Sequence, residues 1–319
     1  MDTIRKTIRE YKPQIKDNSL NLYLRNLKIV YQQIGSFDGE PSSIAFLQSF
    51  DSISKLLMDK PLTTRKNILT SIIVALKAYK KTDLLVKYQV LYLDSIDDYN
   101  TFLKSQKKSV KENINWIPLK ELKNVLDDYK QKLEKNYIFI LDDKKISKDN
   151  FFLLQKYITG MLYIGSIDNP PIRLEYAPMK IIKKKVYDTL PVDKQNDENF
   201  LVITGKNKKE FILNKYKTFK TYGQQRIKLS PVINKVINIW LHYNTSEYLL
   251  LNKNMAPLQT NGLTRLINAV FEPTGKLISA SMIRHIFISE VFPADKKKRE
   301  DIAKLMQHSI TTQTDYAKE

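Results

Sequence analysis

Through the first hundred positions of the chain, apolar side chains recur at spacings of three and four residues, which places them on one face of a helix. Gly35 to Pro41 and then Pro61 interrupt this pattern. The predicted helices cover residues 19–34 with Ser19 as N-cap, residues 42–58, a segment opened by Pro61 with Thr63 or Thr64 as N-cap, and residues 83–103. Four helices with short breaks predict a compact bundle.

The pattern changes beyond a polar stretch, Lys104 to Asn115, which lacks periodicity and is the predicted domain boundary. Phe200–Ile203 and Phe211–Leu213 are short β-type runs around Gly205, which predicts a hairpin, and Gln225–Leu229 predicts another strand. Helices are predicted on both sides of these strands, at residues 118–133, 149–162, 231–243, 258–271, 279–292 and 295–306.

A length of 319 residues suits two domains. We expect a helical domain over residues 1–110 and a mixed α+β domain over residues 111–319. The predicted fold class is mainly α with a small antiparallel β-sheet.

The chain carries 53 Lys and Arg against 34 Asp and Glu, a formal net charge of +19. The surplus is spread over both predicted domains, so both could lie against one polyanion, and double-stranded DNA is the expected partner. A basic protein with no such partner would have the same charge.

Several classes of protein are excluded or disfavoured by composition. The chain has no cysteine, which excludes disulfides and thiol catalysis, and only three histidines, which disfavours a histidine-rich metal centre. No apolar run approaches the roughly 20 residues of a membrane helix, and residues 1–10 lack a secretory signal. We expect a soluble intracellular protein.

The most informative motifs lie near the C-terminus. Ser281-Met-Ile-Arg284-His285 is followed by Leu305-Met-Gln-His308-Ser309 and then by Tyr316, so that Arg284 and His308 are 24 positions apart and His308 and Tyr316 are 8 apart. Each motif is weak alone, but the ordered set with this spacing is specific.

This set resembles the last two boxes of the tyrosine recombinases, the phage-integrase family. There an Arg-His pair opens a helix, a His-Ser or His-Gly pair follows, and the nucleophilic tyrosine comes shortly afterwards. The spacing from His308 to Tyr316, 8 positions, is one residue shorter than is usual in the family. The sequence of the segment Pro170-Pro-Ile-Arg173-Leu-Glu175-Tyr is most similar to integrase-type proteins of large DNA viruses and their virophages.

The resemblance implies a catalytic set of Arg173, Lys217, Arg284, His308 and Tyr316. The family places a lysine in a turn between two strands, and Lys217 fits that position, with Lys206 in the Gly205-Lys turn as the competitor.

The chemistry of strand cleavage suits these residue types. A tyrosine phenol can attack phosphorus and later serve as the leaving group. Two arginines offer permanently protonated forks for the phosphate oxygens. A lysine or histidine can protonate the departing 5′-oxygen. None of these steps uses a metal ion, ATP or another cofactor.

Each residue also has a plain structural interpretation. His285 can pack or orient its helix, His242 is expected to be structural, and Glu175 either orients an arginine or is solvated. Ser281 occupies the place where the family commonly has a histidine or lysine, so the activation of the tyrosine is left open.

The resemblance implies a recombinase or integrase that forms a 3′-phosphotyrosyl intermediate at Tyr316 and acts as a homo-tetramer on two DNA sites. Its residues 1–110 would be a core-DNA-binding domain and residues 111–319 the catalytic domain. Two alternatives remain: a type IB topoisomerase, and an inactive DNA-binding protein of the same fold.

Overall fold

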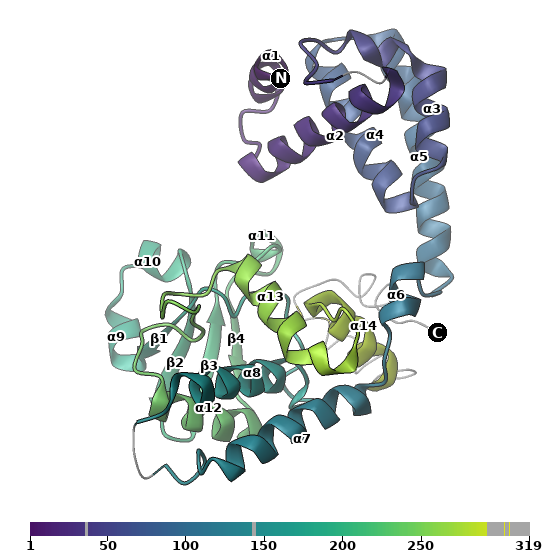
Figure 1. The fold of residues 1–319 in the computed structure, drawn as a ribbon. Coiled ribbons are helices and arrows are strands. Elements are labelled where there is room, and N and C mark those ends of the chain that lie inside the picture. The colour runs from purple at the N-terminus through teal and green to yellow at the C-terminus, as the bar shows by residue number, and fades with distance from the viewer. Residues whose placement is uncertain (36–37, 142–144, 292–302, 304–305, 307–319) are drawn as a thin grey trace. The chain divides into compact units, whose positions relative to one another are not determined.

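The computed structural model describes residues 1–35, 38–141, 145–291, 303 and 306 (Figure 1). The chain divides into two compact units, Met1–Ser105 and Gln106–Glu319. Each unit has its own buried apolar core. None of the described helices is long and apolar enough to cross a membrane.

Unit 1 is entirely helical in its described residues. Its elements are α1 (Asp2–Tyr11), α2 (Asp17–Gly35), a 3-10 turn (Ala45–Gln48), α3 (Phe50–Met58), α4 (Leu62–Ala78) and α5 (Thr82–Lys104). Leu27, Ile72 and Tyr88 are fully buried where α2, α4 and α5 meet. The periodic apolar face of each helix therefore builds one shared core, as in a bundle.

The predicted helices 19–34 and 83–103 are confirmed as α2 and α5, but the details of unit 1 differ in three places. The predicted helix 42–58 is a 3-10 turn followed by α3, which starts only at Phe50. Ser19 lies inside α2, and α4 begins after Pro61 without a side-chain cap, so the predicted N-caps are wrong. The sequence analysis did not predict α1, which buries only Ile4 and Ile8.

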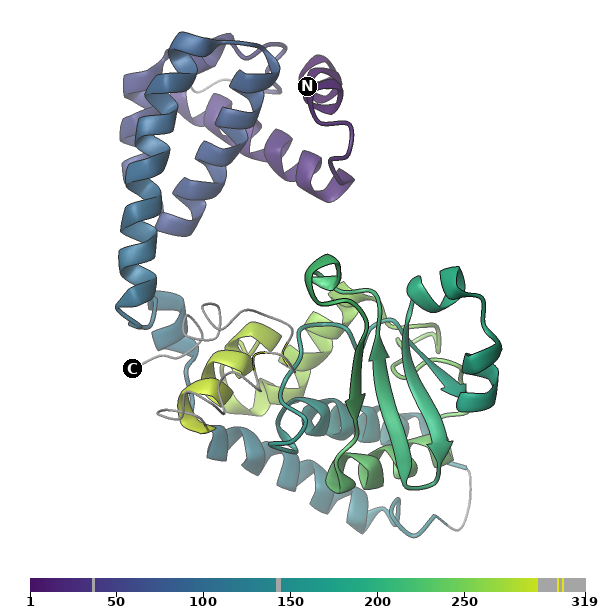
Figure 2. The same cartoon turned by 180° about the vertical axis from the view of Figure 1, so that it is seen from behind.

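Unit 2 combines helices with one sheet (Figure 2). Its helices are α6 (Val110–Asn115), α7 (Leu119–Lys135), α8 (Lys148–Ile164), α9 (Lys184–Thr189), α10 (Val192–Asn196), α11 (Phe219–Tyr222), α12 (Pro231–Tyr243), α13 (Thr260–Phe271) and α14 (Ala280–Val291). The strands are β1 (Met179–Lys183), β2 (Asn199–Gly205), β3 (Lys208–Leu213) and β4 (Gln225–Lys228). The predicted hairpin is confirmed as β2–β3, and the predicted helices up to residue 292 are confirmed as α7, α8, α12, α13 and α14.

The sheet has the order β1-β2-β3-β4 and is mixed, not antiparallel as predicted. β2, β3 and β4 pair antiparallel, but β1 pairs parallel with β2, Met179 opposite Asn199. The difference arises because α9 and α10 carry the chain back to the starting end of β1 before β2 begins, whereas the tight turn after Gly205 leads β2 directly into the antiparallel β3.

Both faces of the sheet are covered over part of their area. Leu201 and Phe211 point into the large core built with α7, α8, α12, α13 and α14. Phe200, Val202 and Ile212 point to the other face and pack with Tyr187 of α9. This alternation makes β2 buried on both sides, which explains its almost continuous apolar run.

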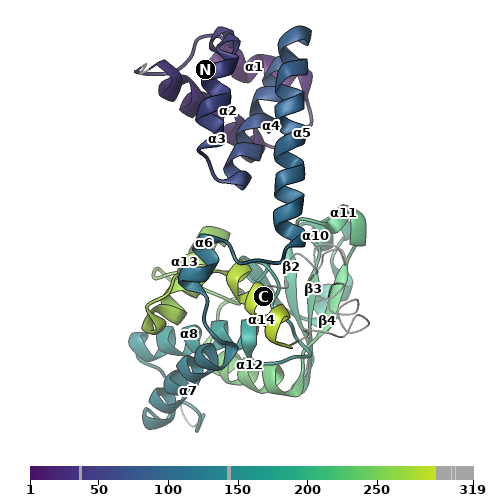
Figure 3. The same cartoon turned by 90° about the vertical axis from the view of Figure 1, so that its right-hand side faces the viewer.

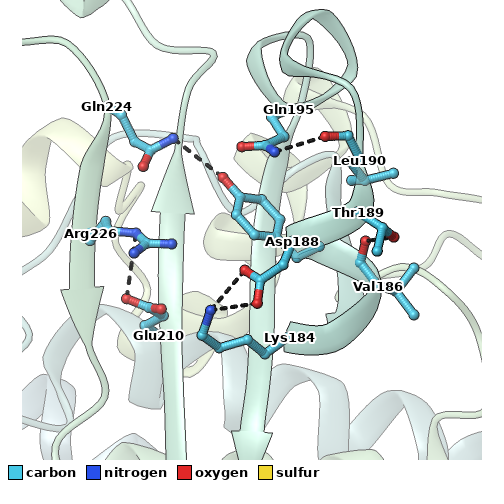
Figure 4. Close-up of polar contacts among 10 residues, drawn as sticks. Lys184, Val186, Asp188, Thr189, Leu190, Gln195, Glu210, Gln224 and Arg226 are labelled. Carbon is cyan, nitrogen blue, oxygen red and sulfur yellow. Dashed lines mark hydrogen bonds and ion pairs between the residues drawn. The ribbon is translucent and has the colours of Figure 1, made fainter.

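Polar contacts surround the smaller core on the α9 face (Figure 4). Lys184 pairs with Asp188 at 2.7 Å, and Arg226 of β4 lies 3.8 Å from Glu210 of β3. The Gln224 side chain donates to the Tyr187 hydroxyl at 3.3 Å. Of these contacts, the hydrogen bond from Gln224 to Tyr187 ties α9 to the end of the sheet where β4 starts.

The polar stretch from Lys104 to Asn115 is not structureless, because it contains α6. Ser109 and Glu112 form a reciprocal capping box at the start of that helix. The Ser-x-x-Glu pattern was visible in the sequence, but no apolar run follows it, so the usual signal of a helix was incomplete.

Candidate functional site

Arg173 lies on the loop between α8 and β1, after Pro170 and Pro171. Two buried side chains fix this loop. Tyr163 of α8 donates its hydroxyl proton to the Arg173 carbonyl oxygen. Asn169 donates to the Lys228 carbonyl oxygen at 2.9 Å and accepts from the Ser230 N–H at 2.7 Å. The backbone of Arg173 is thus attached to both α8 and the β4–α12 junction.

Arg284 lies in the first turns of α14 and is fully buried. One of its terminal nitrogens, Nη2, donates to the Met306 carbonyl oxygen at 3.2 Å. A buried guanidinium requires compensation by acceptors or negative charge, because removing a cation from water is costly. Met306 therefore accounts for one part of that compensation, and one buried carboxyl group interacts with Arg284 electrostatically.

That carboxylate is Glu175, which is 7% exposed and close enough to feel both arginines. Burial raises its pKa above the usual value, while the positive charges of Arg284 and Arg173 act in the opposite direction. Its Oε2 atom is buried without a hydrogen-bond partner among the described residues. Of the two sequence interpretations of Glu175, the solvated one is wrong.

Asn199, at the start of β2, links Glu175 to the chain that follows β3. Its amide nitrogen donates to the carbonyl oxygens of Glu175 and Lys215, at 3.2 and 3.1 Å. Its Oδ1 accepts from the backbone N–H groups of Asn214 and Lys215, at 3.0 and 2.8 Å. This one buried side chain holds the segment that leads into Lys217 beside the Glu175 backbone.

Lys217 is exposed on the connection between β3 and β4, two residues beyond Lys215. Its neighbour Tyr216 donates to the Gly223 carbonyl oxygen at 2.7 Å. Burial raises the pKa of Tyr216, and the negative charge of Glu175 raises it further. The electrostatic influence of Glu175 therefore extends to the residue next to Lys217.

Lys206 lies in the tight β2–β3 turn, at the other end of both strands. Its carbonyl oxygen accepts a hydrogen bond from the buried Lys209 side chain, whose ammonium also donates to Asn234 and Asn238 of α12. Burial lowers the pKa of Lys209. Along β2, Lys206 is seven residues from Asn199, about 23 Å of extended chain.

Glu175 interacts electrostatically with both Arg173 and Arg284, and Asn199 links its backbone to the segment before Lys217. Two predicted catalytic residues, His308 and Tyr316, lie outside the described residues. His285 faces α6, with Nε2 3.6 Å from Glu112 Oε1. Ser281 is exposed on the first turn of α14. His242 packs edge-to-face on Tyr243.

The sequence analysis missed Asn199 and Tyr163, which support the site. Nothing in the sequence distinguishes this asparagine from others, because its role depends on which backbone groups meet at the start of β2. Tyr163 had one visible signal, its place at the end of a predicted helix just before the arginine loop. Within the part of the chain that the structure describes, no cluster of His, Asp or Glu has the arrangement of a metal site.

Comparisons with known proteins find similarity among solved structures. No family model and no curated protein matches the sequence. The crystal structure of XerA recombinase is similar over 100% of this chain and 94% of that chain, with 11% sequence identity and a TM-score of 0.38. At that identity and TM-score the similarity does not assign an activity to this chain.

Proposed function

We propose that the protein is a DNA-strand-exchange enzyme, a site-specific recombinase or integrase of the tyrosine-recombinase type. The observation that carries the proposal is that one buried carboxyl group, Glu175, interacts electrostatically with both Arg173 and Arg284. The two arginines come from segments more than a hundred residues apart, and each belongs to one of the motifs that the resemblance involves. Two guanidinium groups held in this way suit the oxygens of a scissile phosphate.

In the proposed mechanism, Arg173 and Arg284 hold the phosphate and His308 assists them. The phenolate of Tyr316 attacks phosphorus, and the bond from phosphorus to the 5′-oxygen breaks, which leaves a 3′-phosphotyrosyl link. A second 5′-hydroxyl then attacks the phosphotyrosine and releases the tyrosine. The phosphodiester energy is retained, so neither ATP nor a metal ion is needed.

Lys217 is the proposed donor of the proton to the departing 5′-oxygen. Its support is the Asn199 link, which ties Lys215 to the Glu175 backbone, and the effect of Glu175 on the neighbouring Tyr216. Lys206 has weaker support, since it lies at the opposite end of the strand that Asn199 begins. Lys217 is exposed, as a group that must meet a bound DNA strand should be.

The role of Glu175 is to position the arginines. The negative charge of Glu175 acts on both guanidinium groups and would reduce their mutual repulsion before DNA binds. The helical residues 1–110 are proposed to contact DNA, with four copies acting on two sites.

The direct test is cleavage of a suicide DNA substrate, a nicked duplex that traps the covalent intermediate. We expect a protein–DNA adduct linked through a 3′-phosphate, and mass spectrometry should locate it at Tyr316. Tyr316→Phe removes one oxygen, so adducts should disappear while DNA affinity is kept. Adducts that persist in the variant, or that are linked through a 5′-phosphate, would overturn the assignment.

The same assay separates the alternatives. A wild-type protein that binds DNA and never forms an adduct is an inactive DNA-binding protein of this fold. A protein that forms adducts and relaxes supercoils, but exchanges no strands between two duplexes, is a type IB topoisomerase. Strand exchange between two duplexes identifies a recombinase.

A further inference from the structure

Helix α5 of unit 1 carries an exposed apolar stripe formed by Val86, Val90 and Leu93. These side chains are 56%, 57% and 59% exposed. Their spacings of four and three residues place them on one face of the helix. Figure 3 shows α5 at the side of unit 1, next to α4, and α5 also contacts α3.

The stripe is not used by the fold of unit 1. The packed side of α5 is a different one, where Tyr88 and Ser95 are buried and Tyr88 donates to the Leu47 carbonyl oxygen at 2.9 Å. Single exposed aliphatic residues are ordinary, but three in line on a helix mark a contact surface.

The ends of α5 follow the helix dipole, with Asp83 in the first turn and Lys104 in the last. Along one flank of the stripe, Lys87 lies in the first half of the helix and Asp94 in the second half. Both side chains are exposed. This flank is therefore complementary in charge to the same flank of a second, antiparallel copy.

We propose that the stripe is a contact surface for the same stripe of a second copy of this chain, with the two α5 helices antiparallel. Val90 then packs near Val90 of the second copy, and Leu93 packs near its Val86. Lys87 and Asp94 lie on the same flank of the stripe, so each Lys87 meets the Asp94 of the other copy. A parallel pair would place like charges together.

The predicted dimer is weak. Three aliphatic side chains provide much less than the roughly 800 Å² per partner of a typical stable interface. Asp83 and Asp97 continue the stripe at its two ends, and the antiparallel pairing sets Asp83 of one copy near Asp97 of the other. That like-charge contact opposes association, so removing one of the two charges should strengthen the dimer.

Sedimentation velocity on the full chain, without DNA and at protein concentrations up to about 100 μM, tests the proposal. The wild type should show concentration-dependent dimerisation, and Val90→Glu should weaken it about tenfold or more by placing a charge at the centre of the contact. The control is Val192→Glu on α10, which alters a 71% exposed valine and should change nothing. Circular dichroism verifies that both variants fold.

Charge variants decide the orientation. Lys87→Glu should weaken the dimer about two- to fivefold, and adding Asp94→Lys should restore it, because the pair is rebuilt with reversed signs. Asp97→Asn should strengthen association by relieving the contact with Asp83. A monomer at all concentrations, a dimer unaffected by Val90→Glu, or equal losses in Val192→Glu would overturn the proposal. A dimer weakened further by the double reversal would overturn the antiparallel arrangement.

Discussion

The two ends of the sheet in unit 2 each hold a buried charged group, and the two groups differ in how completely their hydrogen bonds are made. At the β2–β3 turn, the Lys209 ammonium has three acceptors: a backbone carbonyl and two asparagine side chains of α12. At the opposite end, the Glu175 carboxylate has two arginines near it and one oxygen with no hydrogen-bond partner among the described residues. A buried charge with every hydrogen bond made is accounted for by the fold, whereas a buried polar atom without a partner calls for another explanation, such as a role in a functional site.

The largest effect is expected at Arg284. Arg284→Lys keeps the positive charge but loses the planar fork that can bind two phosphate oxygens at once. We expect the rate of adduct formation on the suicide substrate to fall about 10²- to 10³-fold. The matched control is Arg226→Lys on the α9 face of the sheet, which should leave the rate unchanged. Equal losses in the two variants would mean that Arg284 acts only through the fold.

The next largest effect is on the rate of cleavage, and it compares the exposed lysines at the two ends of the sheet, Lys217 and Lys206. Lys217→Ala should slow cleavage about 10²-fold, the usual cost of losing a general acid, and Lys206→Ala should not. A substrate with sulfur in place of the 5′-bridging oxygen should restore the rate of the Lys217 variant, since a thiolate leaves without a proton. If the sulfur substrate rescues Lys206→Ala instead, the roles of the two ends are reversed.

A smaller effect, on stability alone, is expected at Lys209. Lys209→Met leaves the two asparagine side chains without their donor and should lower the free energy of unfolding by about 1–3 kcal/mol. Cleavage by the folded variant should stay at the wild-type rate. Urea denaturation measures the first quantity and adduct formation the second. Lys208→Met, one position away and exposed, is the control and should be neutral in both.

The smallest expected effect is a change in how the free energy of unfolding depends on pH when Glu175 is replaced. Burial raises its pKa, so between its usual pKa near 4.5 and that higher value the native state binds more protons than the unfolded chain. The free energy of unfolding should therefore fall as pH rises through that window. Glu175→Gln removes the titration, and the fall should be absent in unfolding curves taken from pH 4 to 8. Parallel curves for wild type and variant would show that this carboxyl titrates alike in both states.

The sequence predicted the helices with long periodic faces, and it predicted the β2–β3 hairpin from two apolar runs around Gly205. It did not predict β1, because Met179–Lys183 has only two central isoleucines between lysines and pairs with a strand that begins sixteen residues later. Motif spacing singled out Arg284, the resemblance required an upstream arginine for which Arg173 was chosen, and both remain predicted site residues. The burial of Glu175 could not be inferred, since it depends on where α14 and the α8–β1 loop lie in three dimensions.

The short helix α6 attaches the start of unit 2 to the region of α14. It starts five residues beyond the boundary of unit 1, and its last turn is fastened to the segment before α14 by the Asn115 side chain, which accepts from the Leu277 N–H at 2.8 Å. Lys276 donates to the Ile114 carbonyl oxygen at 2.7 Å, and Glu112 faces His285. The first helix of unit 2 is therefore anchored by these contacts to α14, which bears Arg284, and to the segment just before it.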